Sequence, residues 1–402
     1  MFCLPLPLNC HGLDSRLGGL WYQLTDNRLN ITSDPLLLPC RIQPHSLPSP
    51  RFLFPLGINP QTLLDAPAEN IFYKKIEEQL SIKDTVVLTW SSRYMQAFDA
   101  CAVRLFKNPN MLYKPQCVLD IRTLLYVCSI FGSAGGKVKN SLPATGQSYG
   151  YRERAERGDH KQRLRILMYL FSWAIDNNPA IAGYLLRPLN SKISLVNESL
   201  SRDRELITLL NDGSLGLLRP LCFERNLLTA IVLNVSTQQL QKITFNICDG
   251  CFLCGTGILT PLRQKNMDID LAGLCQKLYR AKDDDIEKGA DYFTTAYYAS
   301  LSAVEKQVYI ELMRGNIGAL RERSSSVSAK FYQNVLINLG DISQGRLTND
   351  ELNLYYKFCS MMIEKGLQRY ADDTQLLFSV VDENNPADLT LLKQIADYPQ
   401  IL

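Results

Sequence analysis

Three cysteines form the most distinctive cluster of chemically capable side chains in this sequence, Cys248-x-x-Cys251-x-x-Cys254. Thiolates at this spacing hold zinc or an iron–sulfur cluster when a fourth ligand completes the site. Cys275 is the nearest cysteine after the run, and no histidine lies nearby in the sequence. A cysteine-rich turn between two strands explains the same pattern without a metal. Both interpretations stay open, and no metal ligand is assigned.

A second set of candidate functional residues is cationic and lies in residues 151–165. Six basic residues are interspersed there with three acids: Arg152, Arg154, Arg157, Lys161, Arg163 and Arg165, with Glu153, Glu156 and Asp159. A charged run of this kind is typical of a solvated helix face. It also suits a polyanion, because cationic side chains displace counterions from phosphate groups. Tyr149 and Tyr151 would then offer aromatic surfaces on which bases stack.

Composition limits the class of protein in which these side chains act. The chain has 402 residues, of which 46% are hydrophobic and 21% charged. These values indicate a globular protein of two or three domains and exclude collagen-like, disordered and coiled-coil chains. With 43 Lys and Arg against 40 Asp and Glu, the net charge of +3 does not by itself require a nucleic-acid partner.

Cysteine usage and the first residues indicate the compartment. Most of the twelve cysteines lie in apolar surroundings, which favours a reducing compartment. The first ten residues, MFCLPLPLNC, are apolar but lack a basic segment, so they are typical of a buried first strand rather than of a signal peptide. No apolar run of 18 residues follows. We therefore expect a cytoplasmic protein without a membrane segment.

Hydrophobic periodicity predicts the elements that position these residues. Strands alternating with helices over residues 1–188 indicate an α/β layer, with helices at 68–80, 98–106 and 163–177, a strand at 85–89 and a strand passing into a helix over 117–131. In the first helix, Ile71, Phe72, Ile76 and Leu80 share one face. Residues 32–56 have the pattern of loops and one short strand, and 133–148 that of a loop. Short strands follow over 216–259, and helices follow beyond residue 290.

Several segments follow one another in a recognisable order along nearly the whole chain. They are Cys40-Arg41, Leu47-Pro48-Ser49-Pro50, Leu56-Gly57-Ile58-Asn59-Pro60-Gln61, Asn178-Pro179-Ala180-Ile181-Ala182-Gly183-Tyr184-Leu185-Leu186, Pro220-Leu221, Tyr297-Tyr298 and Arg346-Leu347-Thr348. In this order they resemble the bacterial exodeoxyribonuclease I family, which digests single-stranded DNA from its 3′ end. The resemblance implies a ribonuclease H-like exonuclease domain (1–188), a small SH3-like β-barrel domain (189–290) and an α-helical C-terminal domain (291–402).

The family's chemistry needs four acidic side chains that hold two divalent metal ions, and a histidine that activates water. Its first motif, Asp-x-Glu on strand one, falls here on Cys3-Leu4-Pro5-Leu6-Pro7-Leu8, and no acid precedes Asp14. Asp99 fits the second motif. His160 fits the third, but Arg165 stands where the last metal ligand belongs. At most one of four ligands is present, so the resemblance implies a retained scaffold without metal-dependent hydrolysis.

The resemblance also suggests roles for individual residues. Asp99 and His160 are expected as remnants of the catalytic set, with no metal bound, or Mg²⁺ if the chain is active. Residues expected to contact single-stranded DNA are Arg93, Arg104, Tyr151, Arg152, Arg163 and Arg165. Tyr184 is expected to contact a partner protein, for which single-stranded DNA-binding protein is the candidate.

Two alternatives stay open. The chain is an active 3′–5′ exonuclease if its site has diverged, or if an in-frame Asp-x-Glu precedes Met1. It is a protein-interaction scaffold without nucleic-acid affinity if the surface near Arg93, Arg104 and Arg152 lacks a basic groove.

Overall fold

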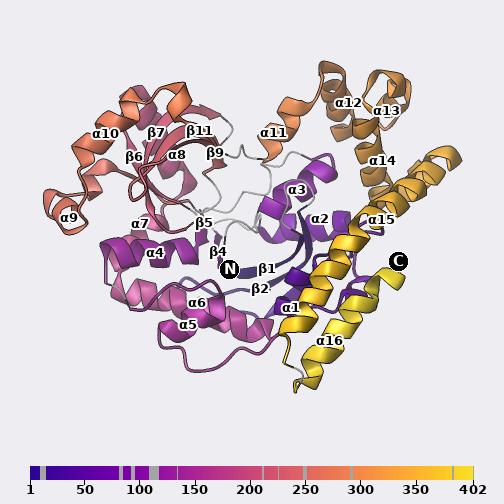
Figure 1. Ribbon diagram of the computed structural model, residues 1–402, viewed down its shortest axis with the longest axis horizontal. Coiled ribbons are helices and arrows are strands. Elements are labelled where there is room, and N and C mark those ends of the chain that lie inside the picture. The colour runs from indigo at the N-terminus through magenta and orange to yellow at the C-terminus, as the bar shows by residue number, and fades with distance from the viewer. Residues whose placement is uncertain are drawn as a thin grey trace.

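The computed structural model describes residues 1–9, 15–80, 85–91, 96–107, 117–133, 135–210, 212–224, 226–247, 251–289, 293–382 and 384–401. Two sheets and many helices make up this mixed α/β fold, as the sequence predicts (Figure 1). None of the helices in these ranges is both long and apolar enough to cross a bilayer.

The first sheet has five strands in the order β3-β2-β1-β4-β5. Their bounds are β1 Phe2–Asn9, β2 Arg16–Gln23, β3 Leu36–Pro39, β4 Val86–Thr89 and β5 Cys117–Asp120. β1 pairs antiparallel with β2 and parallel with β4, which pairs parallel with β5. The central position of β1 explains its almost continuous apolar sequence, because a strand covered on both faces needs no polar side. The prediction of a buried first strand is confirmed.

Helices cover both faces of this sheet. α2 (Glu69–Leu80) and α3 (Gln96–Arg104) share a buried cluster with Cys3. α4 (Ile121–Phe131) and α6 (His160–Asn177) share another with Phe2 and Leu4. Since neighbouring residues of a strand point to opposite faces, the two pairs of helices lie on opposite sides of β1.

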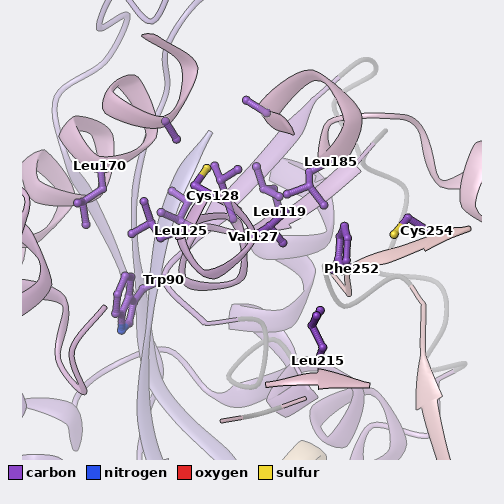
Figure 2. Close-up of a cluster of buried hydrophobic side chains, with 14 of the residues drawn as sticks. Trp90, Leu119, Leu125, Val127, Cys128, Leu170, Leu185, Leu215, Phe252 and Cys254 are labelled. Atoms are coloured by element: carbon purple, nitrogen blue, oxygen red, sulfur yellow. The ribbon is translucent and has the colours of Figure 1, made fainter. Parts of the chain in front are cut away.

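The second sheet has six strands in the order β10-β6-β7-β8-β9-β11. Their bounds are β6 Leu206–Leu209, β7 Leu215–Glu224, β8 Leu227–Asn234, β9 Leu240–Asn246, β10 Leu253–Gly255 and β11 Glu287–Lys288. The helices around it are α7 Pro179–Leu185, α8 Leu189–Ser201, α9 Pro261–Asn266 and α10 Leu271–Arg280. Leu215 and Phe252 from this part join Leu119 and Leu125 of the first part in one buried cluster (Figure 2). The two sheets therefore share a continuous core.

The rest of the chain is helical, as predicted. Its helices are α11 Phe293–Ser300, α12 Ala303–Met313, α13 Gly318–Glu322, α14 Ala329–Ser343, α15 Asn349–Val380 and α16 Pro386–Asp397. α12 and α15 both begin with a capping box, in which Ser302 and Thr348 accept backbone hydrogen bonds and Glu305 and Glu351 reciprocate.

Three expectations about elements are wrong. Residues 32–56 contain α1 (Pro50–Leu56), and residues 133–148 contain α5 (Leu142–Ser148). Each of these short helices has proline in its first turn, where the missing N–H costs nothing. The proline that suggested a loop in residues 32–56 therefore begins a helix. Ile71 is 49% exposed, whereas Phe72 and Ile76 are buried. The inward face of α2 is thus narrower than its apolar residues suggest.

Candidate nucleic-acid interface and degenerate nuclease site

β1 contains residues 3–8, on which the resemblance expects the Asp-x-Glu motif. Leu4 and Leu6 have the spacing of the missing Asp-x-Glu motif and are 9% and 4% exposed. Leu4 packs in the cluster formed with α6, and the ring of Phe2 meets Phe171 of α6 edge to face at 5.8 Å between centroids. Leu6 packs with α1 and α16, where Leu53 and Leu392 are its companions. This part of the strand is tightly filled with hydrocarbon.

His160 begins α6 and is buried rather than presented to solvent. Its ring stacks on Trp21, with 5.7 Å between centroids and 21° between planes, and it has a hydrogen bond with the backbone of Leu56. Burial, and next the charge of Arg163, lower the pKa of His160 to about 4. The ring is therefore neutral at neutral pH and serves as a packing residue in this structure.

This burial of His160 predicts a specific pH dependence of stability. The folded-state pKa of His160 lies below the ordinary 6.5. The contribution of the neutral ring to stability is therefore fully present above pH 6.5 and is lost as the pH falls toward 4. Once the pH has fallen below this folded-state pKa, the lost contribution to the free energy of unfolding amounts to roughly 3 kcal/mol. Urea unfolding at pH 7 and pH 4.5 should show most of this loss. In His160→Phe, which keeps a ring against Trp21, the free energy of unfolding should fall less between the two pH values, because no imidazole is protonated. Equal losses in the two proteins would contradict the burial of a neutral His160.

Asp99 lies in the first turn of α3 and is fully buried. It is one of the charges that raise the pKa of Tyr73 on α2, after burial and the charges of Cys101 and Glu77. Asp99 therefore lies between α2 and α3. His160, the first residue of α6, instead stacks on Trp21. Among the described residues, neither belongs to a group of three His, Cys, Asp or Glu side chains that could hold a metal ion.

Four exposed cations lie on the segment before α6 and on the first two turns of that helix. We call Arg152, Arg154, Lys161 and Arg165 the basic edge. Among the described residues, none of the four has a carboxylate within 4 Å. Lys161 and Arg165 stand one turn apart on the same helix face. Arg163 points the other way, is half-buried and donates to the carbonyl of Pro55 at 2.8 Å.

Arg104 is part of the protein interior, which corrects its expected role in binding DNA. It is 5% exposed, forms two hydrogen bonds to the carboxylate of Glu69, and donates to the carbonyl of Ser15 at 2.9 Å. Arg16 approaches the same carboxylate at 3.5 Å. Because its donors are used inside the fold, Arg104 has no part in a surface for phosphate.

The expected stacking tyrosines pack against other rings of the protein. Tyr149 is 5% exposed, and its ring meets Trp173 edge to face at 4.7 Å. Tyr151 meets Tyr169 at 5.1 Å, and its hydroxyl accepts from the side chain of Gln162 at 2.9 Å. Stacking of bases on these two residues is therefore not supported, and the basic edge offers charge rather than aromatic surface.

Tyr184 lies on α7 at the junction with the second sheet. Its hydroxyl donates to the carbonyl of Leu253 at 2.9 Å, and the guanidinium of Arg187 stands over its ring at 4.6 Å. Burial raises its pKa to about 12. The ring of Tyr184 is half-buried, so it packs inside the protein on one side and reaches the surface on the other. The neighbouring Arg187 is exposed.

The cysteine run does not form a metal centre in the part of the chain that is described. Burial raises the pKa of Cys254 to about 12, and the thiol of Cys251 donates to the carbonyl of Ile247. Burial, followed by Glu205, raises the pKa of Cys275 to about 11. Within the described ranges, no three His, Cys, Asp or Glu side chains are grouped to hold a metal ion.

Three residues used in the sequence analysis lie outside the described ranges. Arg93 was expected to contact DNA, Cys248 is the first cysteine of the run, and Asp14 is the first acid of the chain.

Comparison with solved structures places the whole chain. E. coli exonuclease I in complex with a dA16 oligonucleotide matches with a TM-score of 0.71 and 15% sequence identity, covering 100% of this chain and 98% of that chain. The chain has the exonuclease I fold. An apo exonuclease I structure gives a TM-score of 0.73 at 16% identity with the same coverage. An ExoI/SSB-Ct complex gives 0.72 at 14% identity, covering 99% of this chain and 98% of that chain.

Comparisons by sequence find no match, either among protein-family models or among curated proteins. At this level of identity the exonuclease I fold is retained while most side chains differ.

The exonuclease I fold also shows which residues sequence reasoning misses. Glu69 is the partner of Arg104, and Asp388 on α16 pairs with Arg157 at 2.5 Å. Both acids are far from their partners in the chain, and nothing in the local sequence marks them.

Proposed function

We propose that this chain binds single-stranded DNA on the exonuclease I fold without metal-dependent hydrolysis. The observation that carries the proposal is the apolar packing of β1, where Leu4 and Leu6 lie at the spacing of the Asp-x-Glu motif. Two Mg²⁺ ions need oxygen ligands and negative charge. Leucines on β1 and a cation, Arg165, on α6 supply neither, so the residues present do not fit a pair of divalent metal ions.

The domain roles remain part of this proposal. The strand order of the first sheet supports a ribonuclease H-like unit over residues 1–188, and the six-stranded sheet within 189–290 supports an SH3-like unit. The helices of 291–402 would form the third unit. Because the comparison structures hold single-stranded DNA and SSB, we extend both partners to this chain. Arg152 and Arg165 would meet phosphates, and Tyr184 beside Arg187 would meet the partner protein.

A single assay separates this proposal from the alternatives. Purified protein is incubated with a 5′-labelled oligodeoxythymidine in Mg²⁺, Mn²⁺ or EDTA, with E. coli exonuclease I as the positive control. We expect a shifted complex and intact oligonucleotide in all three buffers. A ladder that EDTA abolishes would show an active exonuclease. Absence of any complex at low salt would favour a protein-interaction scaffold.

Binding at the basic edge predicts a salt dependence. Release of counterions by four cations gives a slope of log K against log[salt] of about −0.7 per contact, hence roughly −3. Lys161→Gln with Arg165→Gln should reduce the slope by about 1.4. Lys74→Gln with Lys75→Gln removes the same charge from α2, on the opposite side of the sheet, and should leave it unchanged. Equal slopes in the two double variants would place the DNA elsewhere.

A further inference from the structure

Arg157 is the one cation of the α5–α6 segment that a distant acid holds within the described structure. Its Nη1 lies 2.5 Å from Oδ2 of Asp388, in the first turn of α16. Its guanidinium stands over the ring of Phe54 in α1 at 3.8 Å from the centroid. The side chain of Arg157 is 33% exposed and that of Asp388 is 16% exposed. The pair is therefore partly buried, and Arg157 is its more exposed member.

The backbone around Arg157 is fixed against the end of α1. Gly57 and Gly158 both have positive φ, 67° and 81°, and a Cβ on Gly57 would lie 2.5 Å from the Cα of Gly158. His160 and Arg163 add hydrogen bonds to the backbone of Leu56 and Pro55. Arg157 is thus held in place by its surroundings whether or not Asp388 is present.

Arg157 is close to the basic edge along the chain. It stands between Arg154 and Lys161 in the sequence, three residues after the first and four before the second. A guanidinium stacked on a ring keeps its N–H groups free for a carboxylate or a phosphate. Asp388 occupies that position in the present structure.

We propose that Asp388 masks Arg157 and competes with a backbone phosphate of the nucleic acid for its guanidinium. This inference rests on the proposed DNA binding. The Arg157 side chain is 33% exposed, so a phosphate can approach its guanidinium and exchange with the carboxylate. Asp388 therefore weakens the binding of nucleic acid at the basic edge. In this way a residue of α16 affects binding near the start of α6.

The test compares Asp388→Asn with Asp372→Asn, which removes the same charge from an exposed, unrelated position on α15. Anisotropy of a fluorescein-labelled oligodeoxythymidine should show about fivefold tighter binding by Asp388→Asn at 0.1 M salt, from one further counterion released. The salt slope should steepen by about 0.7. Asp372→Asn should bind like the wild type, and thermal unfolding verifies that both variants are folded.

A double-mutant cycle identifies Arg157 as the group that is unmasked. Arg157→Gln should bind like the wild type, and Asp388→Asn should gain nothing when Arg157→Gln is also present. An equal gain with or without Arg157, or the same gain in Asp372→Asn, would overturn the inference.

Immobilised heparin separates this inference from the proposed function, because it is a polyanion without bases. Asp388→Asn should elute at higher salt than Asp372→Asn. This result without DNA binding would support the masking of Arg157 and reject the DNA-binding function. Identical elution together with DNA binding by the wild type would reject the masking alone.

Discussion

Replacing Leu4 by Asp and Leu6 by Glu restores the spacing of the missing motif, and we expect it to unfold the protein rather than to restore a nuclease. Both side chains are buried in apolar clusters. A carboxylate in such surroundings lacks partners and costs several kcal/mol. The expected loss in free energy of unfolding exceeds about 4 kcal/mol for the pair, among the largest effects of substitution.

Urea denaturation measures this loss, and the oligonucleotide assay with Mg²⁺ measures activity. Leu6→Met is the matched control, because a swap of similar volume should cost less than about 1.5 kcal/mol. A stable Leu4→Asp, Leu6→Glu variant that degrades DNA only in the presence of Mg²⁺ would show that the cavity of a nuclease is still present.

Arg104→Met is expected to lower the free energy of unfolding by about 3–5 kcal/mol, because it leaves Glu69 buried with one partner fewer. Burial alone would raise the pKa of Glu69, yet Arg104 and Arg16 hold it below its usual value. The carboxylate is therefore charged in the fold, and its contribution to stability is present above its unfolded pKa and lost as the pH falls below it.

Equilibrium unfolding at pH 7 provides the measurement, with Arg165→Met as the control. Arg165 is exposed and without a carboxylate partner among the described residues, so its replacement should change stability by less than about 0.5 kcal/mol. For DNA binding the order should reverse: Arg165→Met weakens it, while Arg104→Met does not in the folded fraction. Weakened binding by folded Arg104→Met would restore this residue to the interface.

These predictions concern side chains of β1 and α6 that are packed into the protein interior. His160 stacks on Trp21, Leu6 packs with α1 and α16, and Arg163 is tied to Pro55. Each contact fastens β1 or α6 to a neighbouring element. Close packing of this kind stabilises a fold.

The elements with long, regular patterns were predictable from the sequence. α6 and α15 have sustained helical periodicity, and β1 and β4 are short apolar runs typical of covered strands. α1 and α5 were missed, because each is 7 residues long and has in its first turn a proline, which also suits a loop. Short helices take their stability from packing against other elements, which local sequence does not show.

The candidate site divides in the same way. The resemblance, applied to the sequence alone, predicts that two metal ions are not held, because residues 3–8 lack acids and Arg165 stands five residues after His160, and ligand chemistry depends on which groups exist. Which arginines are free to meet phosphate was decided only by the tertiary structure. Arg104 is neutralised by Glu69 and Arg157 by Asp388, whereas Arg165 has no such partner in the described structure. The physical reason is that an ion pair depends on distance through space, and the fold brings together charges that lie far apart along the chain.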